Sequence, residues 1–167
     1  FYALATGYTL ENDKASMAIR TFDIFSANRP LLGMPSTASM EVQGSYLFHP
    51  GPTQFWLMAP IYALSGWNTW GLFLGSLFVN LGLAGVGFWA AYRIGSAWVK
   101  WAVVSTFGVV LVGLQFVWFE PWNPFPVIIG FVTLVILSWG ITIGQRGWWP
   151  IAIFVGSVVA QAHLVSI

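Results

Sequence analysis

Long apolar runs separated by short polar connections make up most of the chain from residue 70 onward. Each run is close to the roughly 17 to 25 residues that a helix needs to cross a bilayer. The connections, "RIGSAWVK", "EPWNP" and "GQRG", are typical of antiparallel neighbours in a helical bundle. This pattern predicts four transmembrane helices, at about residues 70–92, 101–119, 125–143 and 148–167.

Shorter apolar segments precede these runs and predict helices that do not cross the membrane. The segment 53–66 would form about 21 Å of helix, against a hydrocarbon core of about 30 Å, and it contains Pro60. Within residues 14–27, polar and apolar side chains fall on opposite helical faces. We expect both segments to be juxtamembrane helices, in an outer region 1–69 that begins with the end of a first transmembrane helix.

Composition agrees with a membrane protein. Of the 167 residues, 57% are hydrophobic and 7% are charged, and the mean hydropathy is +0.76. Soluble domains carry about 25% charged residues. The chain has no cysteine, which excludes disulfides and thiolate metal sites, and its net charge of +1 does not indicate nucleic-acid binding. The expected fold class is an all-α integral membrane protein, a multispanning helical bundle with juxtamembrane helices on its outer side.

The positions of the basic residues predict the orientation in the membrane. Arg93 and Lys100 share one expected connection, and Arg146 lies in the next but one. The positive-inside rule places both connections in the cytoplasm. Glu120 lies in the connection between them and therefore faces outward, as do residues 11–68. We expect a multi-pass protein of the cell membrane with its site on the extracytoplasmic side.

Polar residues gather on that outer side and are the candidate site residues. His163 stands out because an ionisable side chain within a membrane span indicates function by default. Gln161, about 200° from His163 around the same helix, is expected to bond to another helix. No zinc pattern, nucleophile elbow or dinucleotide fingerprint accompanies them. The candidates are Glu11, Asp13, Arg20, His49, Glu120, Asn123 and His163.

Each of these residues also has a purely structural interpretation. Asp13 suits the N-cap of the helix that begins near it. Arg20 is three positions before Asp23, the spacing of a surface ion pair. His49 can hydrogen-bond the turn in "FHPGP", which returns the chain to the membrane surface, and His163 can be a neutral histidine bonded to a neighbouring helix. The sequence leaves these alternatives open.

Several motifs in order resemble a known family. They are "ENDKA" at residue 11, "RPLLGMPSTAS", "HPGPTQFWLMAPIYALSG", "PWNPF" and "GSVVAQAH". Together they resemble the amino-terminal half of actinobacterial multispanning membrane proteins of the GT-C glycosyltransferase superfamily. The resemblance covers nearly the whole chain, and "HPGP" and "PWNP" are its most distinctive parts.

The resemblance implies transfer of a sugar from a polyprenyl-phosphate-linked donor to a cell-envelope glycan or lipid acceptor outside the cytoplasm. Asp13 matches the family's loop aspartate, the general base that takes the proton of the acceptor hydroxyl, and Arg20 and His49 are available to offset charge on the phosphate. Lys14 stands where family members often have a second acid. This departure argues against a divalent metal ion held by a pair of acids.

Two other classes of function compete with sugar transfer. A noncatalytic membrane subunit would use its tryptophan-rich surface to bind lipid or to pack against a larger membrane complex. A transporter would use Glu120 and His163 along its pathway, but no charge lies clearly at the midplane of the expected spans, where transporter sites usually lie. Convergence of Asp13, Arg20 and His49 on one cavity would favour the enzyme.

Overall fold

The computed structural model describes residues 9–36 and 47–163, and this part of the chain is all-α. The all-α prediction is therefore confirmed there. The expected end of a first transmembrane helix falls on residues 1–8, outside the described residues. The last expected span, 148–167, ends too late: its helix stops at Ala162, so His163, which has extended backbone angles, does not lie within it, and residues 164–167 lie outside the described residues. The six α-helices are α2 (Asn12–Asp23), α3 (Thr53–Leu64), α4 (Thr69–Ile94), α5 (Ala97–Gly113), α6 (Pro124–Thr142) and α7 (Trp149–Ala162), with 3-10 turns η2 (Gln115–Trp118) and η3 (Arg146–Trp148).

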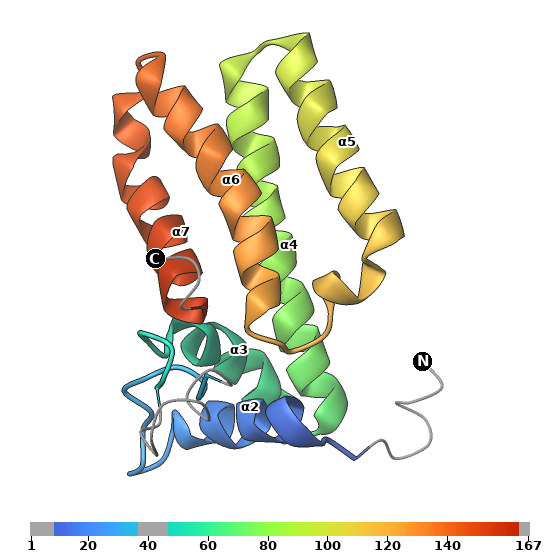
Figure 1. The fold of residues 1–167 in the computed structure, drawn as a ribbon, viewed down its shortest axis with the longest axis vertical. Coiled ribbons are helices and arrows are strands. Elements are labelled where there is room, and N and C mark those ends of the chain that lie inside the picture. Colours follow the sequence, from blue (N-terminus) through green and yellow to red (C-terminus); the bar gives the residue numbers. More distant parts are fainter. Residues whose placement is uncertain (1–8, 37–46, 164–167) are drawn as a thin grey trace.

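Helices α4 to α7 stand side by side, and α2 and α3 lie across one end of them (Figure 1). The central pair is α4 and α6, with α5 packed on α4 and α7 packed on α6. Helix α3 contacts α4 and α7, and α2 packs on α3. We call the end of the bundle that carries α2 and α3 the crossed end, and the opposite end the far end.

Two of these helices, α4 with 26 residues and α6 with 19, are long and apolar enough to cross a membrane. At 1.5 Å per residue they measure about 39 Å and about 28 Å. Helix α5 is also apolar but has 17 residues. Helices α2 and α3, with 12 residues each, are too short to cross.

The connection between α4 and α5 is much shorter than the sequence suggested. Gly95 adopts a left-handed conformation, with φ of 84°, that ends α4, and the next residue, Ser96, is the N-cap of α5. The expected helix 101–119 therefore begins too late. Lys100 lies within the first turns of α5, and its assignment to a connecting loop is wrong.

The same expected helix also ends too late. Helix α5 stops at Gly113, and after Leu114 the chain continues as η2. Two polar side chains one turn apart on α4 hold this segment: Ser76 donates to the carbonyl of Glu120 at 2.9 Å, and Asn80 donates to the carbonyls of Val117 and Trp118 at 3.0 and 3.2 Å. Because these carbonyls find partners on α4, the chain does not need to continue the α-helix.

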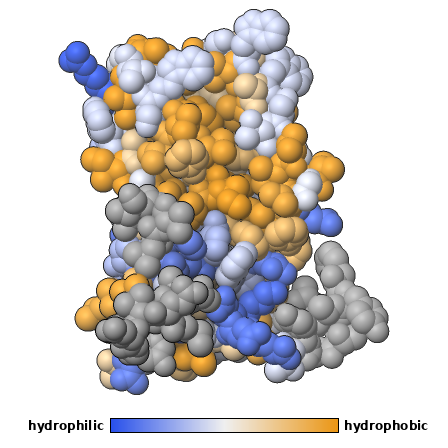
Figure 2. All heavy atoms as spheres, viewed as in Figure 1, coloured by the Kyte–Doolittle hydropathy of each residue, from blue (hydrophilic) through white to orange (hydrophobic). Residues whose placement is uncertain are grey.

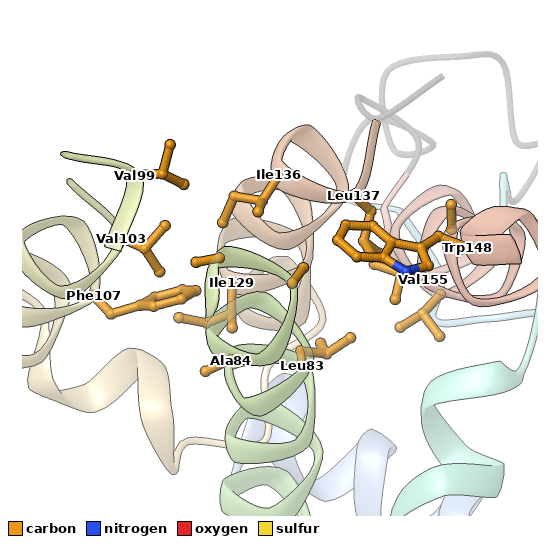
Figure 3. Close-up of a cluster of buried hydrophobic side chains, with 14 of the residues drawn as sticks. Leu83, Ala84, Val99, Val103, Phe107, Ile129, Ile136, Leu137, Trp148 and Val155 are labelled. Carbon is orange, nitrogen blue, oxygen red and sulfur yellow. The ribbon is translucent and has the colours of Figure 1, made fainter. Parts of the chain in front are cut away.

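Two clusters of buried apolar side chains stabilise the fold. The larger cluster lies between α4, α5, α6 and α7; Figure 3 shows Phe107 of α5 on one side of α4 and α6, and Trp148 on the other. The second cluster joins α2, α3 and the start of α4 through Met17, Phe55 and Leu72. This cluster fixes α2 and α3 to the crossed end of the bundle and so positions the side chains of these two helices.

Charged and apolar side chains separate along the bundle axis, as Figure 2 shows: an apolar belt lies between the hydrophilic crossed end and a far end of intermediate hydropathy. The far end carries Arg93, Lys100 and Arg146 and, in the described ranges, no acidic residue. All tryptophans except Trp118, which is buried beside Phe107, lie toward one end or the other. On α4, Trp70 and Trp89 are nineteen positions apart, about 28 Å along the helix.

Candidate functional site

A recess of about 270 Å³ opens at the crossed end, between the start of α2 and the loop that precedes α6. The exposed carboxylate of Asp13 lies in it and accepts a hydrogen bond from the indole Nε1 of Trp122, with Oδ2 at 3.2 Å. This bond joins residues 109 positions apart in the chain. The lining residues are Glu11, Asn12, Asp13, Lys14, Glu120 and Trp122.

The start of α2 directs Asp13 toward the loop. Glu11 has extended backbone angles and occupies the N-cap position, so the interpretation of Asp13 as the N-cap is wrong. Asn12 follows with φ of 50°, a left-handed conformation that asparagine tolerates better than most residues. Asp13 then lies in the first turn of the helix, where the helix dipole stabilises its negative charge.

An ion pair closes one side of the recess. The Nζ atom of Lys14 lies 3.0 Å from Oε1 of Glu120, and it is also 5.9 Å from the centre of the Phe73 ring. Both members of the ion pair are partly exposed, so it adds at most about 1 kcal/mol. Lys14 thus compensates the charge of Glu120, while Glu11 and Asp13 leave the recess negative.

The two histidines lie against each other. The rings of His49 and His163 stack with centres 4.7 Å apart and planes at 30°. His49 is buried, and its backbone N–H and C=O bond to Met34 and Gly33 at 2.9 Å each. A Cβ atom on Gly33 would lie 2.8 Å from Cβ of His49 and 2.9 Å from a backbone oxygen, so only glycine fits beside this histidine.

The surroundings of His49 favour its neutral form. Burial lowers the pKa of the His49 imidazole below its usual 6.5, and the neighbouring His163 lowers this pKa further. The carboxylate of Asp13 acts in the opposite direction and raises the His49 pKa. The charge of Asp13 therefore acts on His49 although this histidine does not line the recess.

A third set of bonds holds the end of α7 next to these groups. Asn123, which is buried, donates to the carbonyl of Ala162 at 3.1 Å. Gln161 accepts a hydrogen bond from Thr53 of α3 and donates to Ser157 at 2.7 Å. The expected interhelical role of Gln161 is confirmed, and these bonds position the last residues of α7 beside the loop.

Arg20 is one of the four candidate residues that do not line the recess, together with His49, Asn123 and His163. Its guanidinium is 5.1 Å from the centre of the Phe48 ring, one residue before His49. Its expected ion pair with Asp23 is not among the ion pairs of the described residues, and Asp23 instead accepts a bond from Ser26 at 3.2 Å. The structure therefore brings Glu11, Asp13 and Glu120 into one recess, stacks His49 on His163 and buries Asn123. Because Arg20 and His49 do not line the recess that holds Asp13, the expected convergence of these three residues on it is wrong.

In the described ranges, no group of three histidine, aspartate or glutamate side chains is arranged to bind a metal ion. Of the carboxylates that share the recess, that of Glu120 is paired with the ammonium group of Lys14. What the recess offers is an exposed carboxylate held by one N–H donor. Such a group can accept a proton from a hydroxyl placed in the recess.

Sequence reasoning missed the partners of the candidate residues. Trp122 was part of a noted motif, but nothing in the sequence linked its indole N–H to Asp13. Ser76 and Asn80 carried a clearer signal, because two polar residues four positions apart on an otherwise apolar helix share one face. Lys14 appeared only as a departure from a family pattern, and its ion pair with Glu120 gives it a structural role.

Comparison with known proteins gives no family assignment: no protein-family model, no curated protein and no solved structure matches the chain. The family resemblance of "ENDKA", "HPGP" and "PWNP" therefore stays a prediction. The chemistry of the site follows from its own residues: a carboxylate, a stacked histidine pair and a negative recess at one end of an apolar bundle.

Proposed function

We propose that the protein spans a membrane, with α4 and α6 crossing it, α5 and α7 packed beside them, and α2 and α3 lying on its extracytoplasmic surface. The apolar belt and the terminal tryptophans support this arrangement, because tryptophan concentrates at both membrane interfaces. The spacing of about 28 Å between Trp70 and Trp89 is close to the thickness of a hydrocarbon core. The cations of the far end then face the cytoplasm, and the recess faces outward.

We further propose that the protein is a GT-C-type glycosyltransferase. It would transfer a sugar from a polyprenyl-phosphate-linked donor to a hydroxyl of a cell-envelope glycan or lipid. The observation that carries this proposal is the carboxylate of Asp13, exposed in a recess at the surface of the bundle and held there by Trp122. A base in this position can reach both an acceptor from the aqueous side and a donor from the bilayer.

In this mechanism Asp13 is the general base. Trp122 binds Oδ2, so Oδ1 is the oxygen that accepts the proton of the acceptor hydroxyl. The acceptor oxygen forms a bond to the anomeric carbon of the sugar as the bond from that carbon to the phosphate oxygen breaks. Polyprenyl phosphate leaves with the electron pair. No redox step or further reactant is required.

Charge divides the site into an acceptor side and a donor side. The recess holds three carboxylates and one ammonium group, which suits a neutral hydroxyl better than a phosphate. Arg20, whose guanidinium lies 5.1 Å from the centre of the Phe48 ring, offers a cation outside the recess. We assign it to the donor phosphate, whose negative charge grows as the sugar leaves.

Sugar transfer by the full-length protein in membranes tests this function. Radiolabelled sugar is supplied on polyprenyl phosphate, and the wild type is compared with Asp13→Asn. The matched control is Asp23→Asn, the same substitution on the same helix at a residue that does not line the recess. Because general-base catalysis contributes about 10² to 10⁴ in rate, we expect Asp13→Asn to lose that factor and Asp23→Asn to keep wild-type activity.

The outcomes separate the parts of the proposal. Equal transfer by the wild type and Asp13→Asn, at equal protein levels, would show that Asp13 is not the general base. The protein would still be a glycosyltransferase, with a different residue as its base. Absence of transfer from any polyprenyl-phosphate donor would favour the alternative, a noncatalytic membrane subunit. That alternative has an observation of its own: large apolar side chains are exposed around α2 and α3, among them Ile19, Leu31 and Leu64 at 63%, 84% and 87%.

A further inference from the structure

We propose that the far end binds an anionic phospholipid in a groove between α4 and α5. The groove has a volume of about 440 Å³, within the range of about 300 to 1,000 Å³ that ligand sites occupy. It lies at the opposite end of α4 from Asp13, so it is separate from the sugar-transfer site. Its lining residues are Phe88, Trp89, Ala91, Tyr92, Lys100 and Val104.

The lining of the groove is apolar and aromatic except for one cation. The Nζ atom of Lys100 lies 4.8 Å from the centre of the Tyr92 ring, which keeps the ammonium group at the mouth of the groove. The aromatic side chains are open to the surroundings, with Tyr92 exposed at 70% and Trp89 at 41%. An apolar groove with one fixed cation fits an amphiphile with a negative head.

The groove also has the direction of a lipid in the inner leaflet. Tyr92 and Lys100 lie close to the helix ends at the α4–α5 connection. Phe88 and Val104 each lie four positions further toward the bundle centre, about 6 Å deeper. A lipid phosphate beside Lys100 therefore places its acyl chain along Phe88 and Val104, parallel to the bundle axis.

Charge decides which lipid the groove would take. Arg93 follows Tyr92 in the last turn of α4 and adds a second cation, and the described residues of this end include no acid. Basic pockets between transmembrane helices on the cytoplasmic side bind anionic head groups. A zwitterionic head would bring its own cation toward Lys100 and Arg93, so we commit to an anionic phospholipid.

This inference rests on the proposed membrane orientation but not on sugar transfer. A lipid at this position would pack between the first turns of α5 and the last turns of α4. Only Gly95 and Ser96 connect these turns, so a bound lipid would stabilise the packing of the end of α4 against the start of α5. Loss of the lipid site would leave the recess around Asp13 unchanged.

Lipid retention by the purified full-length protein tests the inference. The detergent-solubilised protein is incubated with phosphatidylglycerol or phosphatidylcholine of identical acyl chains, and bound lipid per protein is counted by native mass spectrometry. We expect the wild type to retain phosphatidylglycerol at least about fivefold better, the contribution of roughly one cation near a lipid head. Lys100→Gln should lower this preference, because only Arg93 then remains near the head group, whereas Lys100→Arg should keep it.

Two further variants separate the groove from the general charge of the far end. Arg146→Gln removes a cation of the same end outside the groove, and it should keep the preference. Val104→Trp fills the groove and should lower retention of both lipids. Equal retention of the two lipids by the wild type would overturn the inference, as would an unchanged preference in Lys100→Gln. A separate test of insertion into liposomes distinguishes the two proposals. A protein that does not insert would contradict both the membrane proposal and the lipid site. A protein that inserts but shows no lipid preference would contradict the lipid site alone.

Discussion

Trp122 is the residue whose side chain holds the proposed base in place. Its Nε1 bonds to Asp13, and its ring packs edge-on against Phe125 with centres 5.0 Å apart. Trp122→Phe keeps an aromatic ring at this position but removes the N–H donor together with the second ring of the indole. Because the carboxylate then loses its orientation, we expect kcat for sugar transfer to fall about tenfold, roughly the value of one charge-assisted hydrogen bond, with little change in KM.

The control for this substitution is Trp101→Phe, at an exposed tryptophan of the far end. It should transfer sugar at the wild-type rate. Identical kcat values for Trp122→Phe and the wild type would show that the bond to Asp13 has no part in the reaction. A loss in both tryptophan variants would point to folding rather than to the site.

His49 makes stability depend on pH. Its pKa in the folded protein lies below 6.5, because burial and the neighbouring His163 disfavour the charged ring. Between the folded pKa and 6.5 the unfolded chain binds more protons than the folded one. The stabilising contribution is therefore complete above about pH 6.5 and is lost as the pH falls through the folded pKa. We expect the thermal midpoint of the purified protein to fall between pH 7.5 and pH 5.

His163→Phe is the informative variant for this effect. It keeps a ring stacked on His49 and removes the charge of the second imidazole. The decrease in the midpoint toward pH 5 should then be smaller than in the wild type, because burial alone lowers the His49 pKa. A midpoint that does not change with pH in the wild type, or a larger decrease in the variant, would contradict this account.

At the level of residues, the sequence predicted a location better than it predicted contacts. Placing Glu11, Asp13 and Glu120 on one side required only the order of the apolar runs and the charges between them. The bonds of Asp13 with Trp122 and of Lys14 with Glu120 depend on how a helix start and a distant loop meet. No local sequence pattern predicts the contact between the start of α2 and this loop, because the contact depends on the packing of α2 and α3 onto α4.

At the scale of elements, glycines determine how closely the helices approach. Trp148 lies against Gly140 of α6, and a Cβ atom at that glycine would overlap the indole ring. Gly140→Ala must displace a ring that is itself buried beside Trp89, with centres 5.0 Å apart. We expect the substitution to lower the free energy of unfolding by about 1 to 3 kcal/mol.

The comparison is Gly85→Ala in α4, where an added Cβ atom meets nothing within 4 Å. Alanine favours the helix over glycine by up to about 1 kcal/mol, so this variant should be as stable as the wild type or more stable. Denaturation in detergent, followed by circular dichroism, measures both. Equal stability of the two alanine variants would mean that α6 and η3 are not packed as described.

Helix positions were easier to predict than helix ends. The apolar runs expected at 70–92 and 125–143 correspond to α4 and α6, each shifted by at most two residues at an end. The run expected at 101–119 was displaced at both ends, because Gly95 and Ser96 start α5 early and because Ser76 and Asn80 hold the segment after Gly113. Hydrophobicity does not report such bonds, since they come from another helix.

At the scale of the whole molecule, the separation of charges along the bundle axis was predictable from the sequence. The face of α2 that is buried was not. The sequence indicated that Arg93, Lys100 and Arg146 oppose the acidic residues, and the described structure has this separation. It did not indicate that α2 buries Met17 and Thr21 while leaving Ile19 and Phe22 exposed at 63% and 47%. Which apolar face a short helix buries depends on its neighbours, here α3 and the start of α4.

The hydrogen bond between Asp13 and Trp122 joins residues that are far apart in the sequence, and this separation has a consequence for biosynthesis. A ribosome adds about 5 to 20 residues per second, so the 109 positions between the two residues take roughly 5 to 20 s to synthesise. During that interval α2 has been made, but the indole that orients its carboxylate does not yet exist. The recess is completed only after α4 and α5 have been made, so a ribosome that stalls earlier releases a chain that lacks the complete site.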